Sequence, residues 1–158
     1  MDKKLVIILI GLCFGCALPN DIQKDDPVPH KIKEFEFQGS LSTYSDRWQL
    51  AEDIHHYQIE LDKRDYREID SITFTASLRS SNNSSRAFAE LYNLTDSASI
   101  GNSVLTSQIR NWLHSVNSED IARNIPDYPV KLTIRLRSEY NDNYVEVNGK
   151  QVLRVYYK

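Results

Sequence analysis

VKLTIRLR, residues 130–137, is the stretch that decides the fold class of this chain. Its apolar residues recur at every second position, with lysine, threonine and arginine between them. Because successive side chains of a β-strand point to opposite faces, this alternation predicts a strand with one buried and one solvated face. Ile134 and Leu136 are expected in the core, and Arg135 and Arg137 on the face toward water.

The same alternation extends to other parts of the chain. Residues 72–79 and 153–157 repeat it clearly, and weaker alternation predicts strands at residues 35–44, 54–61, 86–92, 104–107, 109–116 and 144–147. Single helical turns are expected at Asp62–Arg67 and Ser118–Ala122. Asn148–Gly149 predicts a type I′ hairpin turn flanked by Val147 and Gln151.

Short strands joined by turn residues, without alternating helices, favour an antiparallel β-sandwich. The predicted fold class is therefore all-β, with a jelly-roll sandwich over residues 35–158. The chain has 158 residues, of which 41% are hydrophobic and 26% charged, so it has enough apolar side chains for one domain core. Its net charge of -3 predicts no broad basic surface, and a nucleic-acid partner is not expected.

The first residues have the organisation of a signal peptide. Lys3 and Lys4 precede an apolar run at residues 5–15, which is shorter than the roughly 20 residues of a membrane-spanning helix. A helix of the domain core would carry polar residues at a period of about 3.6, and this run has none. Residues 1–15 are therefore expected to be a cleaved signal peptide.

Residues 12–16, Leu-Cys-Phe-Gly-Cys, resemble a lipobox, the processing site of bacterial lipoproteins. Gly15 and Cys16 match its small residue and its lipidated cysteine, whereas Cys13 stands where a leucine is usual. The resemblance implies lipid chains on Cys16 and attachment to a membrane without a spanning helix. Residues 16–34, which are mostly polar and contain prolines, are then the lipidated cysteine and a flexible tether.

This interpretation places the protein in the bacterial cell envelope, lipid-anchored in the outer membrane, so that the membrane is a partner through the lipid. If Cys16 is instead an ordinary apolar thiol of a signal peptide that is cut nearby, the protein is secreted or periplasmic and unanchored. Both cysteines precede the predicted domain, so no disulfide is expected inside it.

Three segments of the predicted sandwich resemble the galactose-binding-like jelly-roll modules and related β-sandwich modules of bacterial surface and phage proteins. They are residues 71–76, 89–96 and 130–138. The resemblance lies in the spacing of the strands and in the turn LYNLTD at residues 91–96. It implies the jelly-roll fold, and it transfers no catalytic or ligand residue.

No motif for catalysis, a cofactor or a metal stands out. Gly-x-Ser-x-Gly, a phosphate-binding glycine-rich loop and His-Glu-x-x-His are absent, so a non-catalytic protein without a cofactor is expected. His55 and His56 are neighbours on a predicted strand, so they point to opposite faces and do not share a zinc ion. Calcium at Asp96 or at Asn141–Asn143 is an alternative, although neither segment has EF-hand spacing.

The candidate ligand-binding residues include three aromatic side chains, Trp48, Tyr92 and Trp112. Sugars present apolar C–H faces ringed by hydroxyl groups, so a glycan site combines a flat aromatic ring with hydrogen-bonding side chains. Asn111, which adjoins Trp112, is one such side chain. The alternative is that Trp48 and Trp112 fill the core.

The other candidates are Arg135 and Arg137, which Arg79 and Arg154 would join if their strands are neighbours. Guanidinium groups bind carboxylates and phosphates through two parallel hydrogen bonds, which indicates a polyanionic glycan or a lipid headgroup. The alternative is a solvated face that discourages edge-to-edge aggregation.

The expected function is that of an envelope or surface-anchored lipoprotein whose β-sandwich binds a ligand, such as a glycan, without catalysis. The alternative is a structural or assembly subunit that docks to an envelope protein. The first function requires an exposed aromatic ring beside polar side chains, and the second requires an exposed apolar patch.

Lipid attachment is tested at the two cysteines. Cys16→Ala is expected to abolish metabolic labelling with palmitate, because Cys16 follows a small residue at the end of the apolar run. Cys13→Ala is the matched control and is expected to leave the labelling unchanged. Labelling that persists after Cys16→Ala would rule out the lipoprotein interpretation.

Overall fold

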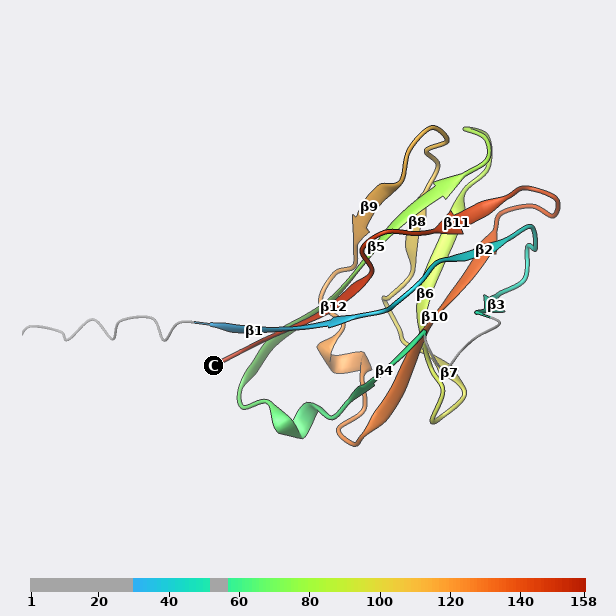
Figure 1. Cartoon of the computed structure of the whole chain (residues 1–158). Helices are drawn as coiled ribbons and strands as arrows, with labels where there is room; N and C mark the ends of the chain where they lie inside the picture. Colours follow the sequence, from blue (N-terminus) through green and yellow to red (C-terminus); the bar gives the residue numbers. More distant parts are fainter. Residues whose placement is uncertain (1–29, 52–56) are drawn as a thin grey trace, which may run out of the picture.

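The computed structural model describes residues 30–51 and 57–158, which form two β-sheets packed face to face (Figure 1). Sheet A contains β1 (Lys31–Glu36), β2 (Leu41–Thr43), β5 (Ile69–Ser80), β9 (His114–Asn117), β11 (Val145–Val147) and β12 (Val152–Tyr157). Sheet B contains β3 (Gln49–Leu50), β4 (Gln58–Leu61), β6 (Ala87–Asn93), β7 (Ala98–Ser99), β8 (Leu105–Ser107) and β10 (Val130–Ser138). Two 3-10 turns complete the described elements, η1 (Lys63–Asp65) and η2 (Ala122–Asn124).

Each sheet is four strands wide, and we call each of these four positions a track. Some tracks hold two short strands, which follow one another beside the same neighbouring strand. In sheet A the order is β1/β2, then β11/β12, then β5, then β9. In sheet B the order is β3/β4, then β10, then β6, then β7/β8. All of these pairings are antiparallel, and the eight tracks have the arrangement of a jelly roll, so the predicted fold class is confirmed.

The core lies between the sheets and is built from the alternating apolar residues. Ile134 and Leu136 on β10 are fully buried, as are Phe74 and Leu78 on β5. Because each strand has a period of two, these inward rows leave every intervening residue on an outer face. The predicted inward rows of residues 72–79 and 130–137 are therefore confirmed.

Several predicted boundaries differ from the structure. The first strand already begins at Lys31, before the expected start of the domain at residue 35. The predicted strand at residues 35–44 is divided into β1 and β2, and Gly39 between them has a φ of 110°. The predicted strand at residues 109–116 holds a strand only from His114 onward. The predicted strand start at residues 54–56 lies outside the described residues.

Asn148–Gly149 does not form the predicted hairpin. Strands β11 and β12 do not pair with each other, since both pair with the same side of β5, where Val147 lies opposite Leu78 and Val152 opposite Thr75. Gly149 has a φ of 77°, but Asn148 is not among the residues with positive φ, which a type I′ turn also requires. Asn148–Gly149 is therefore part of a bulge that interrupts one continuous track.

The two predicted helical turns are close to their expected places. The Asp62 carboxylate accepts a hydrogen bond from the Arg64 N–H at 3.0 Å and so caps η1. Near η2, the Asp120 carboxylate accepts a hydrogen bond from the Ile72 N–H at 2.9 Å. In this way the segment before η2 covers the part of β5 that extends past β9.

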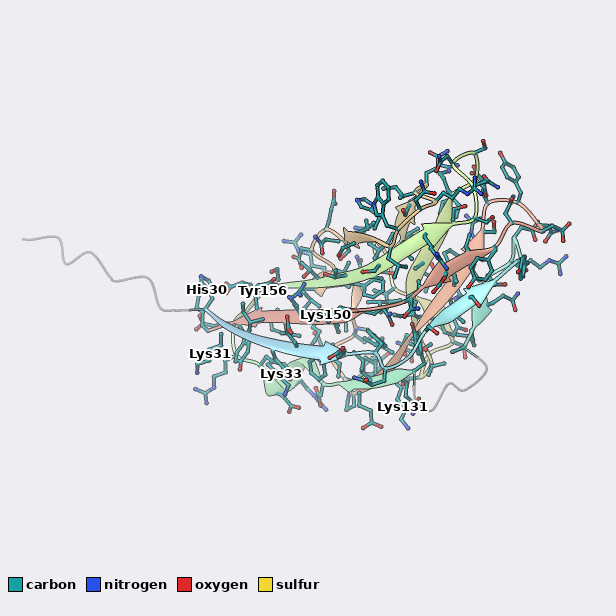
Figure 2. The ribbon with its side chains drawn as sticks, turned by 45° about the horizontal axis from the view of Figure 1, so that its top comes forward. His30, Lys31, Lys33, Lys131, Lys150 and Tyr156 are labelled. Atoms are coloured by element: carbon teal, nitrogen blue, oxygen red, sulfur yellow. The ribbon has the colours of Figure 1, made fainter. Side chains whose placement is uncertain are left out.

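The chain enters the sandwich at one end, and four loops gather at the other. The loops at residues 44–48, 81–86, 108–113 and 139–144 gather at one end, which we call the loop end (Figure 1). The start of β1 lies at the opposite end, where His30, Lys31 and Tyr156 are close together (Figure 2). The chain thus enters the domain at the end remote from these four loops.

The N-terminal predictions fall on residues that the structure does not describe. The signal peptide at residues 1–15, the lipidated Cys16 and most of the tether lie within residues 1–29. Among the described residues, no helix is long and apolar enough to cross a membrane.

The register of β10 predicts unequal effects of two substitutions on the same strand. Leu136→Ala is expected to lower the free energy of unfolding by about 2–5 kcal/mol, because Leu136 is fully buried and the change leaves a cavity. Lys131→Ala, on the exposed outer face, is the control and is expected to cost less than about 1 kcal/mol. Urea denaturation of the full chain measures both values, and equal effects would contradict the register.

Candidate functional site

Four of the five predicted ligand residues meet on the outer face of sheet B. Arg135 and Arg137 project from β10, Tyr92 projects from the neighbouring β6, and Trp48 directly precedes β3 on the other side of β10. The antiparallel register places Arg135 opposite Glu90 and Arg137 opposite Phe88. Side chains that lie opposite each other on one face are within contact distance, so the register itself assembles this group.

The arginine and aromatic side chains interleave. The Arg135 Cζ lies 4.0 Å from the ring centroid of Tyr92 and 5.6 Å from that of Trp48. The Arg137 Cζ lies 4.1 Å from the ring centroid of Phe88 and 5.0 Å from that of Trp48. We call these five residues the Arg–aromatic stack, and cation–π attraction stabilises each contact. Guanidinium groups lie over the rings of Trp48 and Tyr92, so the ring faces that they cover are closed to a sugar.

Arg135 does not face water, contrary to the prediction, because it is bound to a buried carboxylate. Its Nε donates to Glu90 Oε1 at 3.0 Å, its Nη2 bonds to the same oxygen, and Nη2 also donates to Ser99 Oγ at 2.8 Å. Glu90 is only 4% exposed. A buried carboxylate is costly unless it is paired, so Arg135 has a structural role.

Arg137 is held in the same stack but has no carboxylate bound to it among the described residues. Its Nη1 donates to the Ser138 carbonyl oxygen at 3.3 Å. The carboxylate of the neighbouring Glu139 is bound by Arg86, whose Nε donates to Oε1 at 3.1 Å, and this hydrogen bond lowers the pKa of Glu139. The remaining N–H donors of Arg137 have no hydrogen-bond acceptor among the described residues.

The fifth predicted residue, Trp112, lies in the loop between β8 and β9 at the loop end. Its side chain is 61% exposed, so it does not fill the core. It lines a hollow of about 310 Å³, which we call the Trp112 hollow, together with Asn83, Gln108, Ile109, Arg110 and Asn111. A second hollow of about 340 Å³ shares Arg110 and Asn111 with the first.

The polar side chains at the Trp112 hollow have unused donors and acceptors. Among the described residues, Asn83, Gln108, Arg110 and Asn111 form no hydrogen bond through their side chains. Arg79, which lines the second hollow, is instead paired with Glu146. Burial raises the pKa of Glu146, but hydrogen bonds from Asn148 and Arg79 outweigh this effect and leave the pKa below its ordinary value.

The predicted basic stripe of four arginines does not form. Arg79 and Arg154 belong to sheet A, where they pair with Glu146 and Glu34, whereas Arg135 and Arg137 lie on sheet B. The sequence could not show this, because alternation within a strand gives no information about which sheet the strand joins.

The part of the chain that the structure describes contains no cluster of metal-ligating side chains. No group of three or more His, Cys, Asp or Glu side chains there is arranged to hold a metal ion. The carboxylate of Asp96, considered above for calcium, accepts hydrogen bonds from Asn93 Nδ2 at 2.6 Å and from the Tyr128 hydroxyl at 2.7 Å. Both bonds go to the same oxygen of Asp96, which is thus engaged by the protein itself.

Comparison with known proteins adds no relative to this description. No protein-family model matches the chain, and no curated protein matches it. Function is therefore inferred from the geometry of the chain itself.

The buried pair of Glu90 and Arg135 is tested by removing one partner. Glu90→Ala is expected to lower the free energy of unfolding by about 3–5 kcal/mol, because Arg135 is left without its carboxylate in a largely buried position. Glu60→Ala is the control, since Glu60 is 74% exposed and its pair with Lys131 is worth less than about 1 kcal/mol. Chemical denaturation measures both, and a small loss for Glu90→Ala would contradict the structural role of the pair.

Proposed function

We propose that this chain is a non-catalytic lipoprotein, anchored to the bacterial outer membrane through Cys16, that binds a glycan at the loop end of its β-sandwich. The observation that carries the proposal is the exposed ring of Trp112 beside unused polar side chains. Trp112 is 61% exposed and lines the same hollow as Asn83, Gln108 and Asn111.

This combination fits the chemistry of a sugar. The apolar C–H face of a sugar ring stacks on a flat aromatic side chain, while amide groups exchange hydrogen bonds with its hydroxyl groups. Hollows of about 310 and 340 Å³ are at the lower end of the volumes found for ligand sites. A short saccharide segment on an open surface suits this size.

Other aromatic rings at the loop end support the proposal. Tyr44 is 60% exposed and Tyr140 is 57% exposed. The rings of Tyr44 and Tyr144 lie 5.3 Å apart between their centroids. An end of the domain with several exposed rings and many asparagine side chains offers further contacts to a ligand that is longer than one sugar.

The position of the loop end agrees with a lipid anchor. The chain enters the sandwich at the opposite end, at the start of β1 (Figure 1). An anchor on Cys16 would therefore join the sandwich at the end opposite the loops, so that the tether itself does not cover them.

The assembly-subunit alternative requires a continuous apolar patch, and the exposed aliphatic side chains are dispersed. Leu50 lies on β3 and Val104 lies beside β8, at opposite edges of sheet B, while Ile32 lies on sheet A. Single exposed apolar residues are normal on a protein surface. This distribution favours the glycan proposal.

A glycan array probed with the full chain tests the proposal. Trp112→Ala is expected to weaken binding to a glycan ligand about tenfold or more, because burying an aromatic side chain contributes roughly 1.5–3 kcal/mol. Tyr128→Ala is the control, since Tyr128 is 46% exposed outside the loop end.

Two results would overturn this function. One is glycan binding that Trp112→Ala does not weaken. The other is an absence of glycan binding together with saturable binding of one envelope protein, which would support the assembly subunit.

A further inference from the structure

Arg137 is fixed in position by the two rings between which it lies. Its Cζ is 4.1 Å from the ring centroid of Phe88 and 5.0 Å from that of Trp48. A long side chain normally loses considerable conformational entropy when it binds a ligand. Because the stack already restricts Arg137, a ligand that binds it causes a smaller further loss of side-chain entropy.

The donors of Arg137 are available, unlike those of the neighbouring arginines on the same face. Arg135 is bound to Glu90 and Arg86 is bound to Glu139. Arg137 donates only to the Ser138 carbonyl oxygen among the described residues. A guanidinium has five N–H donors, so several of them remain for a ligand.

Those donors suit an oxyanion. The planar fork of a guanidinium matches the two oxygens of a carboxylate or sulfate, and such bonds are roughly twice as strong as those between neutral groups. Arg137 is also half-buried, so the charge interaction is less weakened by water than at a fully exposed site. Glu139, whose carboxylate also feels the charge of Arg137, is already paired with Arg86.

We propose that Arg137 holds the carboxylate or sulfate group of an acidic glycan. This inference rests on the proposed function, which it extends by naming the ligand class. Arg137 is next to the last residue of β10 and Trp48 belongs to the loop at residues 44–48, so the oxyanion site adjoins the loop end. A charged sugar at Arg137 and a neutral sugar at Trp112 would give the domain its preference for acidic chains.

The test compares acidic and neutral oligosaccharides of equal length, with uronic acids in one and the corresponding neutral sugars in the other. The full chain is expected to bind the acidic oligosaccharide about tenfold or more tightly, and Arg137→Gln is expected to remove this preference. Arg137→Lys is expected to lose most of it, because an ammonium lacks the fork. Arg86→Lys is the matched control, since Arg86 also lies over Phe88 but already has a carboxylate partner.

A second measurement separates this site from the proposed function. The chain has two tryptophans, so Trp112→Phe leaves Trp48 as the single fluorescent indole, in contact with Arg137. Titration with glucuronate or sulfate is expected to change Trp48 fluorescence saturably, and glucose is not. Thermal unfolding of each variant confirms that it is folded.

The outcomes distinguish the two proposals. Equal binding of acidic and neutral oligosaccharides, or an acidic preference that survives Arg137→Gln, overturns the oxyanion site. A Trp48 response to sulfate that Arg137→Gln removes, in a chain that binds no oligosaccharide, supports the oxyanion site and overturns the glycan function. Preferential binding of acidic peptides at Arg137 overturns the assignment to a glycan.

Discussion

The sandwich depends on the burial of two alternating rows of apolar side chains, one on β5 and one on β10. Ile72, Phe74 and Leu78 face inward from sheet A, and Ile134 and Leu136 face inward from sheet B. A slip of one residue in either strand would bring its outer residues into the core, so the register is strongly determined. The same constraint places the arginine and aromatic side chains of sheet B together on the outer face.

Two arginines on one strand thus acquire different roles from their cross-strand neighbours. Arg135 lies opposite Glu90, and the pair is buried as part of the fold. Arg137 lies opposite Phe88, which covers its guanidinium without satisfying its hydrogen-bond donors. A ring restricts the motion of the side chain but leaves its charge without a partner, and this combination is what a binding site for an anion requires.

Patterns that depend only on neighbouring residues were sufficient to predict β5, β10 and β12, because each shows the period of two over many residues. The Asn148–Gly149 turn was predicted wrongly, since pairing of both flanking strands with β5 overrides the local turn preference. Strands β3 and β7 have two residues each, too few to show a period. The pairing of Glu90 with Arg135 needed the register between β6 and β10, which no single segment contains.

The open edge of β1 bears on how two copies of this chain meet. Strand β1 pairs with β12 and forms an outer edge of sheet A, and its sequence Lys-Ile-Lys-Glu-Phe-Glu places a charged side chain at four of its six positions. An open edge is a template on which a second copy can add a strand, and charged side chains oppose this. If the proposed lipid anchor holds many copies on one bilayer, these copies meet more often than copies in free solution, and charged side chains on this edge would then oppose strand-to-strand pairing between them.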